Sequence, residues 1–180
     1  MNQDFTLEPG SKTSVSAVAI RYALIVGIIN IIYSIILYIT DLHITSKFLS
    51  YVSFLIIIVG IYLAHKHFKN ENGGYMSYGQ GLGIGTLLSG IVGLLSGIFT
   101  FIYMQFIDTG LMERAQEMQI VELEKRGMSE EQIEQALKMA QSFTSPGMMI
   151  VWSIVAFLFV GFLFSLIISA ITKHTRPEFE

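Results

Sequence analysis

The 180-residue chain has no cysteine, three prolines, one tryptophan and few charged residues. Without cysteine it forms no disulfide and offers neither a thiolate nucleophile nor a cysteine metal ligand. Charged residues make up 14% of the chain, whereas soluble domains usually carry about 25%. The formal net charge is only -3, and the sequence has no basic tract of the kind that binds nucleic acid. This shortage of charge, with a mean hydropathy of +0.59, indicates a membrane protein.

Four apolar segments are long enough to cross a bilayer, whose hydrocarbon core takes about 20 residues of helix. They are residues 22–39, 48–64, 81–106 and 148–171. We therefore predict an all-α integral membrane four-helix bundle, with spans one to three in residues 19–107 and span four in 147–173. Residues 1–18 are polar and are predicted to form a flexible tail rather than a cleaved signal peptide. Residues 174–180 form a second predicted tail.

The third span carries small residues at every fourth position, and bulky apolar residues occupy its other faces. These small residues are Gly81, Gly85, Ser89, Gly93 and Gly97. Positions four apart share one face of a helix, and a face of small residues lets another membrane helix approach closely. The fourth span has a similar series, Gly161, Ser165 and Ser169. We predict that spans three and four pack along these two series. The GxxxG motif at 93–97 indicates close packing without specifying the partner, and we expect packing within one chain rather than homodimerisation.

Few polar residues interrupt the spans. Asn30 lies near the middle of span one and Ser34 one turn later, while Thr86 lies in span three. A buried amide needs a hydrogen-bond partner, so we expect Asn30 to bond to another helix. The alternative is a ligand contact in a polar cavity formed with Ser34 and Thr86. His65 and His67 point about 200° apart on a helix, and we interpret them as a solvated, basic helix end.

Catalytic patterns are missing from the chain. No Asp, Glu, Lys or His lies within the spans away from their ends, whereas pumps and proton-coupled carriers usually need such groups. Residues 79–85 are rich in glycine, but they lack the third glycine of a dinucleotide loop and the Lys-Ser/Thr pair of a phosphate loop. We therefore expect no enzymatic activity, no cofactor and no metal site.

Residues 108–146, between spans three and four, are patterned as two helices. The first has an apolar stripe of Leu111, Ala115, Met118 and Val121, and the second a stripe of Ile133, Ala136, Leu137, Ala140 and Phe143. Gly127 suits the residue that ends the first helix, and Ser129 with Gln132 forms a capping box for the second. We predict a helical hairpin that buries its apolar faces together. Its inner stripe lying on the membrane surface is the alternative.

Charge is distributed unevenly between the two ends of the predicted bundle. The segment 108–146 has eight acidic and four basic residues, a formal charge of -4. The end with the termini carries Lys12, Arg21, Lys66, Lys69, Lys173 and Arg176. The hairpin end has a similar number of basic residues, Lys47 and the four in 108–146, but most of these lie far from a span. Because basic residues near spans remain in the cytoplasm, both termini are predicted to be cytoplasmic and the hairpin extracytoplasmic. The acids are either a solvated face or a patch that captures a cation or a basic partner.

Several short motifs resemble those of a known family. They are NGGYMSYGQGLGIG (72–85), FIYMQFID (101–108), SPGMM (145–149) and FSLIISAITKH (164–174). They are similar to an uncharacterised four-span membrane family, domain of unknown function 4199, which is found mostly in Bacteroidota. The resemblance implies a bacterial inner-membrane protein with a polar insert between spans three and four. It implies no known activity, so no catalytic residue is carried over.

These observations lead to two functional hypotheses. The first is a non-enzymatic envelope scaffold or accessory subunit that contacts another membrane or envelope protein through the acidic hairpin. The second is a small transporter or lipid-binding membrane protein that uses a cavity near Asn30, Ser34 and Thr86. In both hypotheses the protein contacts the lipid bilayer and does not bind nucleic acid. The sequence does not determine the oligomeric state.

Overall fold

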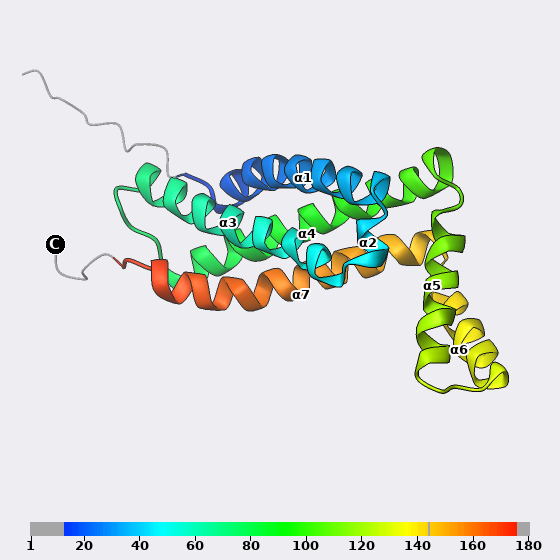
Figure 1. The fold of residues 1–180 in the computed structure, drawn as a ribbon. Helices are drawn as coiled ribbons and strands as arrows, with labels where there is room; N and C mark the ends of the chain where they lie inside the picture. Colours follow the sequence, from blue (N-terminus) through cyan, green and yellow to red (C-terminus); the bar gives the residue numbers. More distant parts are fainter. Residues whose placement is uncertain (1–12, 144, 176–180) are drawn as a thin grey trace, which may run out of the picture.

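The computed structural model describes residues 13–143 and 145–175, and every regular element within them is helical (Figure 1). The long helices are α1 (Val15–Ile39), α3 (Lys47–Glu71), α4 (Tyr78–Ile102) and α7 (Pro146–Thr172). The shorter elements are α2 (Leu42–Thr45), the π-helical turn η1 (Tyr103–Ile107), α5 (Leu111–Lys125) and α6 (Glu130–Phe143). The four long helices are apolar and long enough to cross a membrane. The prediction of an all-helical chain with four apolar spans is therefore confirmed.

Two helix boundaries differ from the sequence prediction. Helix α1 begins at Val15, inside the predicted flexible tail, of which residues 1–12 lie outside the described residues. Helix α3 continues past Ala64 to Glu71. Its extra turns are stabilised by packing, because Phe68 is buried with 1% of its surface exposed. The residues after Ala64 therefore continue the helix instead of ending it.

The C-terminal boundary also differs. His174, two residues beyond the end of α7, forms an isolated antiparallel bridge with Met76 in the α3–α4 connection. The two backbone hydrogen bonds measure 2.8 and 2.9 Å. The predicted tail therefore starts with a residue that is fixed to the bundle, and residues 176–180 lie outside the described part of the chain.

Helix α4 is the central element of the bundle. It packs most extensively against α7 and then α1, while α3 packs against α1, α7 and α4 (Figure 1). The core has buried residues from α1, α3 and α4, among them Ala23, Ile57, Ile61, Ile84, Leu88 and Val92. The wide contact with α7 follows from the small residues on α4, which permit a short distance between helix axes.

The outer surface of the four long helices is apolar as well. On α1, Ile28 and Ile36 are 57% and 53% exposed, while Ala19 and Ala23 are fully buried. Small residues of this helix thus face its neighbours, and most of its isoleucines face outward. This distribution is expected where lipid rather than water surrounds the bundle.

Candidate functional site

Helices α4 and α7 meet along the two predicted series of small residues. Gly81 faces Ser169, Gly85 faces Ser165, and Ser89 faces Gly161. The two helices are antiparallel. The residue number therefore rises by four on α4 and falls by four on α7 from one pair to the next. Ser165 and Ser169 are fully buried, and within the described residues their hydroxyls have no hydrogen-bond partner. They therefore serve this contact through their small size.

The closest backbone approach lies further along the same contact, at Gly93 and Gly97. A Cβ atom at Gly93 would lie 3.0 Å from the Cα atom of Ile154, and one at Gly97 would lie 3.1 Å from the Cα atom of Ile150. The Ser153 hydroxyl donates a 2.9 Å hydrogen bond to the Gly93 carbonyl. A larger side chain on α4 would meet backbone atoms here and would force the helices apart.

The three residues of the predicted polar cavity have different surroundings. Asn30 is 1% exposed and donates from Nδ2 to the carbonyl of Ser53 on α3 at 3.3 Å. Ser34 and Thr86 are partly buried, and the Thr86 hydroxyl has no partner among the described residues. None of the four pockets described for the chain is lined by any of these three residues. Asn30 thus forms an interhelical hydrogen bond, as we expected.

A buried histidine joins α3, α4 and α7 at the end of the bundle where α4 begins and α7 ends. The His65 ring on α3 is 0% exposed, and its Nε2 lies 2.9 Å from the carbonyl oxygen of Gly81 on α4. Its Nδ1 lies 2.9 Å from the hydroxyl of Thr172 on α7. A carbonyl only accepts, so Nε2 carries the proton that is donated to Gly81. Lys69 also donates to the Thr172 carbonyl at 3.2 Å. We call His65, Gly81, Thr172 and Lys69 the histidine junction.

Our interpretation of His65 as part of a solvated helix end was wrong. The reason is that α3 does not end at Ala64. Ile57, Ile61 and Phe68 are all buried on α3, and His65 lies on the same helical face as these residues. The helical spacing of apolar residues on α3 continues through Phe68. A helix predicted to extend to Phe68 would have placed His65 on the buried face. His67, by contrast, is only partly buried.

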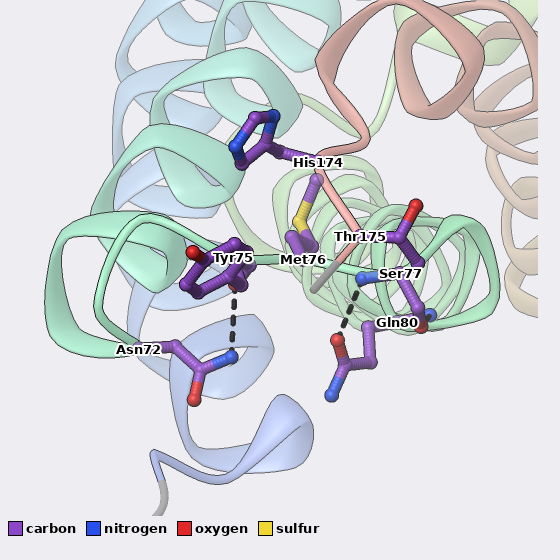
Figure 2. A pocket seen from close by; sticks show the side chains of 7 residues that line it. All are labelled: Asn72, Tyr75, Met76, Ser77, Gln80, His174 and Thr175. Atoms are coloured by element: carbon purple, nitrogen blue, oxygen red, sulfur yellow. Dashed lines mark hydrogen bonds between the residues drawn. The ribbon is translucent and has the colours of Figure 1, made fainter. Parts of the chain in front are cut away.

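A pocket of about 240 Å³ opens beside this junction (Figure 2). Its lining consists of Asn72, Tyr75, Met76, Ser77, Gln80, His174 and Thr175. The rings of Tyr75 and His174 stack with centroids 5.3 Å apart. Gly73 and Gly74 have φ values of +64° and +87°, a backbone conformation that glycine adopts without strain. These glycines turn the chain so that Met76 reaches His174.

The N-terminus of α4 forms one wall of this pocket. The Ser77 hydroxyl accepts from the Gln80 amide, and the Gln80 side chain accepts from the Ser77 amide (Figure 2). This capping box satisfies two backbone donors that would otherwise face the pocket. The pocket is therefore lined by groups that are engaged in holding the α3–α4 connection.

An arginine joins α5 to the opposite end of the bundle. The Arg114 guanidinium lies 2.5 Å from Asp108 Oδ2 and 3.4 Å from Asp41 Oδ1. Asp108 lies six residues before Arg114, between η1 and α5, whereas Asp41 follows α1 and is 73 residues away in the sequence. The bond to Asp41 is therefore the one that connects α5 to a distant segment. Leu111, at the start of α5, is fully buried at the same place. We call Asp41, Asp108 and Arg114 the arginine junction.

Ion pairing changes the protonation behaviour of this junction. The hydrogen bond from Arg114 holds the pKa of the Asp108 carboxyl below its usual 3.8, and the same bond raises the pKa of Arg114. Asp108 is therefore ionised at neutral pH, as the contact requires. The junction fixes the start of α5 to the end of the bundle.

Part of the apolar stripe of α5 lines a pocket at the end of the bundle. Met118 and Val121 are 45% and 42% exposed, and both line a pocket that α5 shares with His43 and Thr45 at α2. The cause is the burial of Leu111, because a stripe that starts from a residue anchored at the bundle end continues along the bundle side of α5. The caps agree with prediction: Gly127 has φ +77°, and Ser129 and Gln132 form reciprocal hydrogen bonds.

The chemistry available in these places is that of structural contacts. Both ring nitrogens of His65 are hydrogen-bonded, and Asp108 and Arg114 are paired. Among the described residues, no group of three His, Asp or Glu side chains is arranged to hold a metal ion. The two junctions set the positions of the helices at each end of the bundle.

Comparisons with known proteins give one match. Neither the curated proteins nor the solved structures include a match to this chain. A family described as a protein of unknown function (DUF4199) matches residues 21–174. The matched region includes the α4–α7 contact and both junctions, and it confirms the resemblance that the sequence motifs indicated. The chain therefore belongs to the DUF4199 family of proteins of unknown function.

Proposed function

We propose that this protein is a non-enzymatic scaffold or accessory subunit of a bacterial cell envelope. Its four spans lie in the cytoplasmic membrane, and both termini are in the cytoplasm. Helices α5 and α6 form an extracytoplasmic helical hairpin that presents an acidic surface to another membrane or envelope protein. The proposal concerns a contact surface and assigns no catalytic residue.

The observation that carries this proposal is the arginine junction. A hairpin on a mobile linker would present no defined surface, whereas α5 is held by Asp108 at the end of η1 and by Asp41 after α1. Exposed acids, Glu113, Glu117 and Glu124, lie along α5 on the side away from the bundle. A fixed acidic surface supports recognition of a basic partner, because such a surface loses little conformational freedom on binding.

The orientation in the membrane is supported by the charge of each end. The end with the histidine junction carries Arg21, Lys66, Lys69 and Lys173, whereas residues 108–146 have a formal charge of -4. Basic residues close to a span favour the cytoplasmic side. The non-enzymatic assignment is supported by His65, whose two nitrogens both bond to other helices and are not available for proton transfer.

The alternative, a small transporter or lipid-binding protein with a polar cavity, has less support. Its proposed lining was Asn30, Ser34 and Thr86. Asn30 is bonded to α3, and none of these residues lines a described pocket.

The test is purification from native membranes in a mild detergent, followed by intact-mass analysis of the complex. We expect a stoichiometric protein partner that is lost from the variant Glu113→Lys, Glu117→Lys, Glu124→Lys. The matched control is charge reversal at the other end, Lys66→Glu, which should retain the partner. A partner that stays bound to the α5 variant, or a protein that purifies with only a defined lipid, would contradict the proposal.

A further inference from the structure

Helix α5 has two opposite faces with different chemistry. One face lines a pocket of about 460 Å³, in which α2 contributes His43 and Thr45 and α5 contributes six residues, Met118 and Val121 among them. Since α2 lies at the end of the bundle, this face of α5 is directed back toward the bundle. Glu117 and Glu124 are exposed and lie about half a helical turn from this face. Glu117 and Glu124 therefore point away from the bundle, whereas Glu122 lies on the pocket face.

Helix α6 also has an apolar side that faces the bundle and an acidic side that faces away from it. Its last residue, Phe143, has its ring centroid 6.4 Å from that of Trp152 on α7, so this side of α6 also faces the bundle. Met139 lies one turn earlier and is 68% exposed. Glu134 lies on the opposite side of the helix from Phe143 and is exposed. Both helices thus direct apolar residues toward the bundle, and Glu117, Glu124 and Glu134 point away from it.

The direction of α5 and α6 agrees with this polarity. Both helices run across the long axis of the bundle and extend beyond its side (Figure 1). The long axis of four membrane-spanning helices is close to the membrane normal, so helices that cross it lie along the membrane surface. The face that looks back toward the bundle is then the face that looks toward the bilayer.

The lipid-facing surface of the bundle also continues up to these helices. Phe106 and Ile107, at the end of η1, are 75% and 64% exposed, and Trp152 is 49% exposed. Large apolar and aromatic side chains at the end of a span are typical of the boundary between acyl chains and headgroups. The exposed residues of α5 and α6 are therefore neighbours of a surface that lipid already covers.

We infer that α5 and α6 lie on the bilayer, with Met118, Val121, Met139 and Phe143 inserted between lipid headgroups. The bound surface is a phospholipid bilayer rather than a protein. An amphipathic helix with its charged face in water and its apolar face at the acyl boundary binds membranes in this way. Lys125, on the pocket face of α5, can extend its amine to a lipid phosphate. Glu122 on the same face is paired with Arg126 at 2.7 Å.

The experiment uses the full chain in phosphatidylcholine nanodiscs and measures the depth of single spin labels by their collisions with oxygen and with a water-soluble nickel chelate. The chain has no cysteine, so each labelled site is unique. The test variants are Met118→Cys and Met139→Cys, and the matched controls are the nearby outward-facing Glu117→Cys and Glu134→Cys. Val121→Cys provides a second test site on α5, and the melting temperature of each variant checks that it folds.

We expect the ratio of oxygen to nickel accessibility to be several-fold higher at 118, 121 and 139 than at 117 and 134. Equal, water-like ratios at all sites would overturn the inference, because they would place the two helices in solvent. Low accessibility to both reagents at 118 and 139 would also overturn it, since protein and not lipid would then cover this face. The nanodisc contains no other protein, so the result does not depend on the partner proposed above.

Discussion

At Gly93 the backbones of α4 and α7 leave no room for a side chain. A Cβ atom there would lie 2.9 Å from Phe157 Cβ and 3.0 Å from Ile154 Cα. We expect Gly93→Leu to destabilise the bundle by about 1–3 kcal/mol, the usual cost of overpacking, and to lower its melting temperature in mild detergent. The matched control is Gly90→Leu on the same helix, because a Cβ at Gly90 would meet only Leu158 Cδ1, at 3.5 Å. Equal melting temperatures for the two variants would contradict the prediction.

Two buried polar residues, Asn30 and His65, show what can and cannot be predicted for a single side chain from the sequence. The interhelical bond of Asn30 could be predicted, because a buried amide in a span has few alternatives. The burial of His65 could not be predicted once α3 was taken to end at Ala64. Its two bonds, to Gly81 and Thr172, need partners from helices that are separated in sequence. Only the tertiary arrangement brings those partners together.

At the scale of a helix, the attachment of α5 depends on the charge of Asp108. Because its pKa is lowered in the folded protein, its stabilising contribution is present above the usual pKa of 3.8 and is lost as the pH falls through the lower folded value. We expect hydrogen exchange at the start of α5 to speed up, relative to the four spans, over that acidic range. Asp108→Asn should show faster exchange already at neutral pH and should lack this pH dependence.

The control for this prediction is a second arginine–carboxylate pair on the same helix, Arg126 with Glu122. That pair is exposed and lies within one helix, and exposed pairs contribute little. Glu122→Gln should therefore leave the exchange at Leu111 unchanged. An Asp108→Asn variant that keeps the native exchange rate there would show that Leu111 packing alone attaches α5.

In residues 108–146, the caps between α5 and α6 were more predictable than the faces of these helices. Gly127, Ser129 and Gln132 are local signals, and their hydrogen bonds form between neighbours in sequence. The face of α5 that looks toward the bundle depends instead on the burial of Leu111 and on the bond from Arg114 to Asp41, 73 residues away in the sequence. The apolar stripe could be recognised from its spacing, but its surroundings could not. Packing of the α5 and α6 stripes against each other stays a prediction.

At the scale of the whole molecule, the pairing of α4 with α7 could be predicted because both carry small residues at the same spacing. The position of α3 against α7 has no such signal in the sequence, because its apolar residues suit lipid and protein neighbours equally. For the same reason, hydropathy predicts the number of spans but not how they are arranged.

The charge difference between the two ends of the molecule leads to a prediction about topology. One end carries Lys66 and Lys69, and the other carries a segment with a formal charge of -4. The positive end should remain in the cytoplasm. We test this with single-cysteine variants in a chain that has no other cysteine, Asn70→Cys at the end of α3 and Glu131→Cys in α6, both at exposed positions.

In intact cells, a membrane-impermeant maleimide should label Glu131→Cys, and it should label Asn70→Cys only after the membrane is disrupted. A second pair, Lys66→Cys and Glu134→Cys, controls for local reactivity, because each member is an exposed residue near its counterpart. The reverse labelling pattern would place α5 and α6 in the cytoplasm. Labelling of both ends in intact cells would mean two orientations, which would contradict a topology set by the basic residues at one end. Either result would remove the extracytoplasmic contact surface on which the scaffold proposal depends.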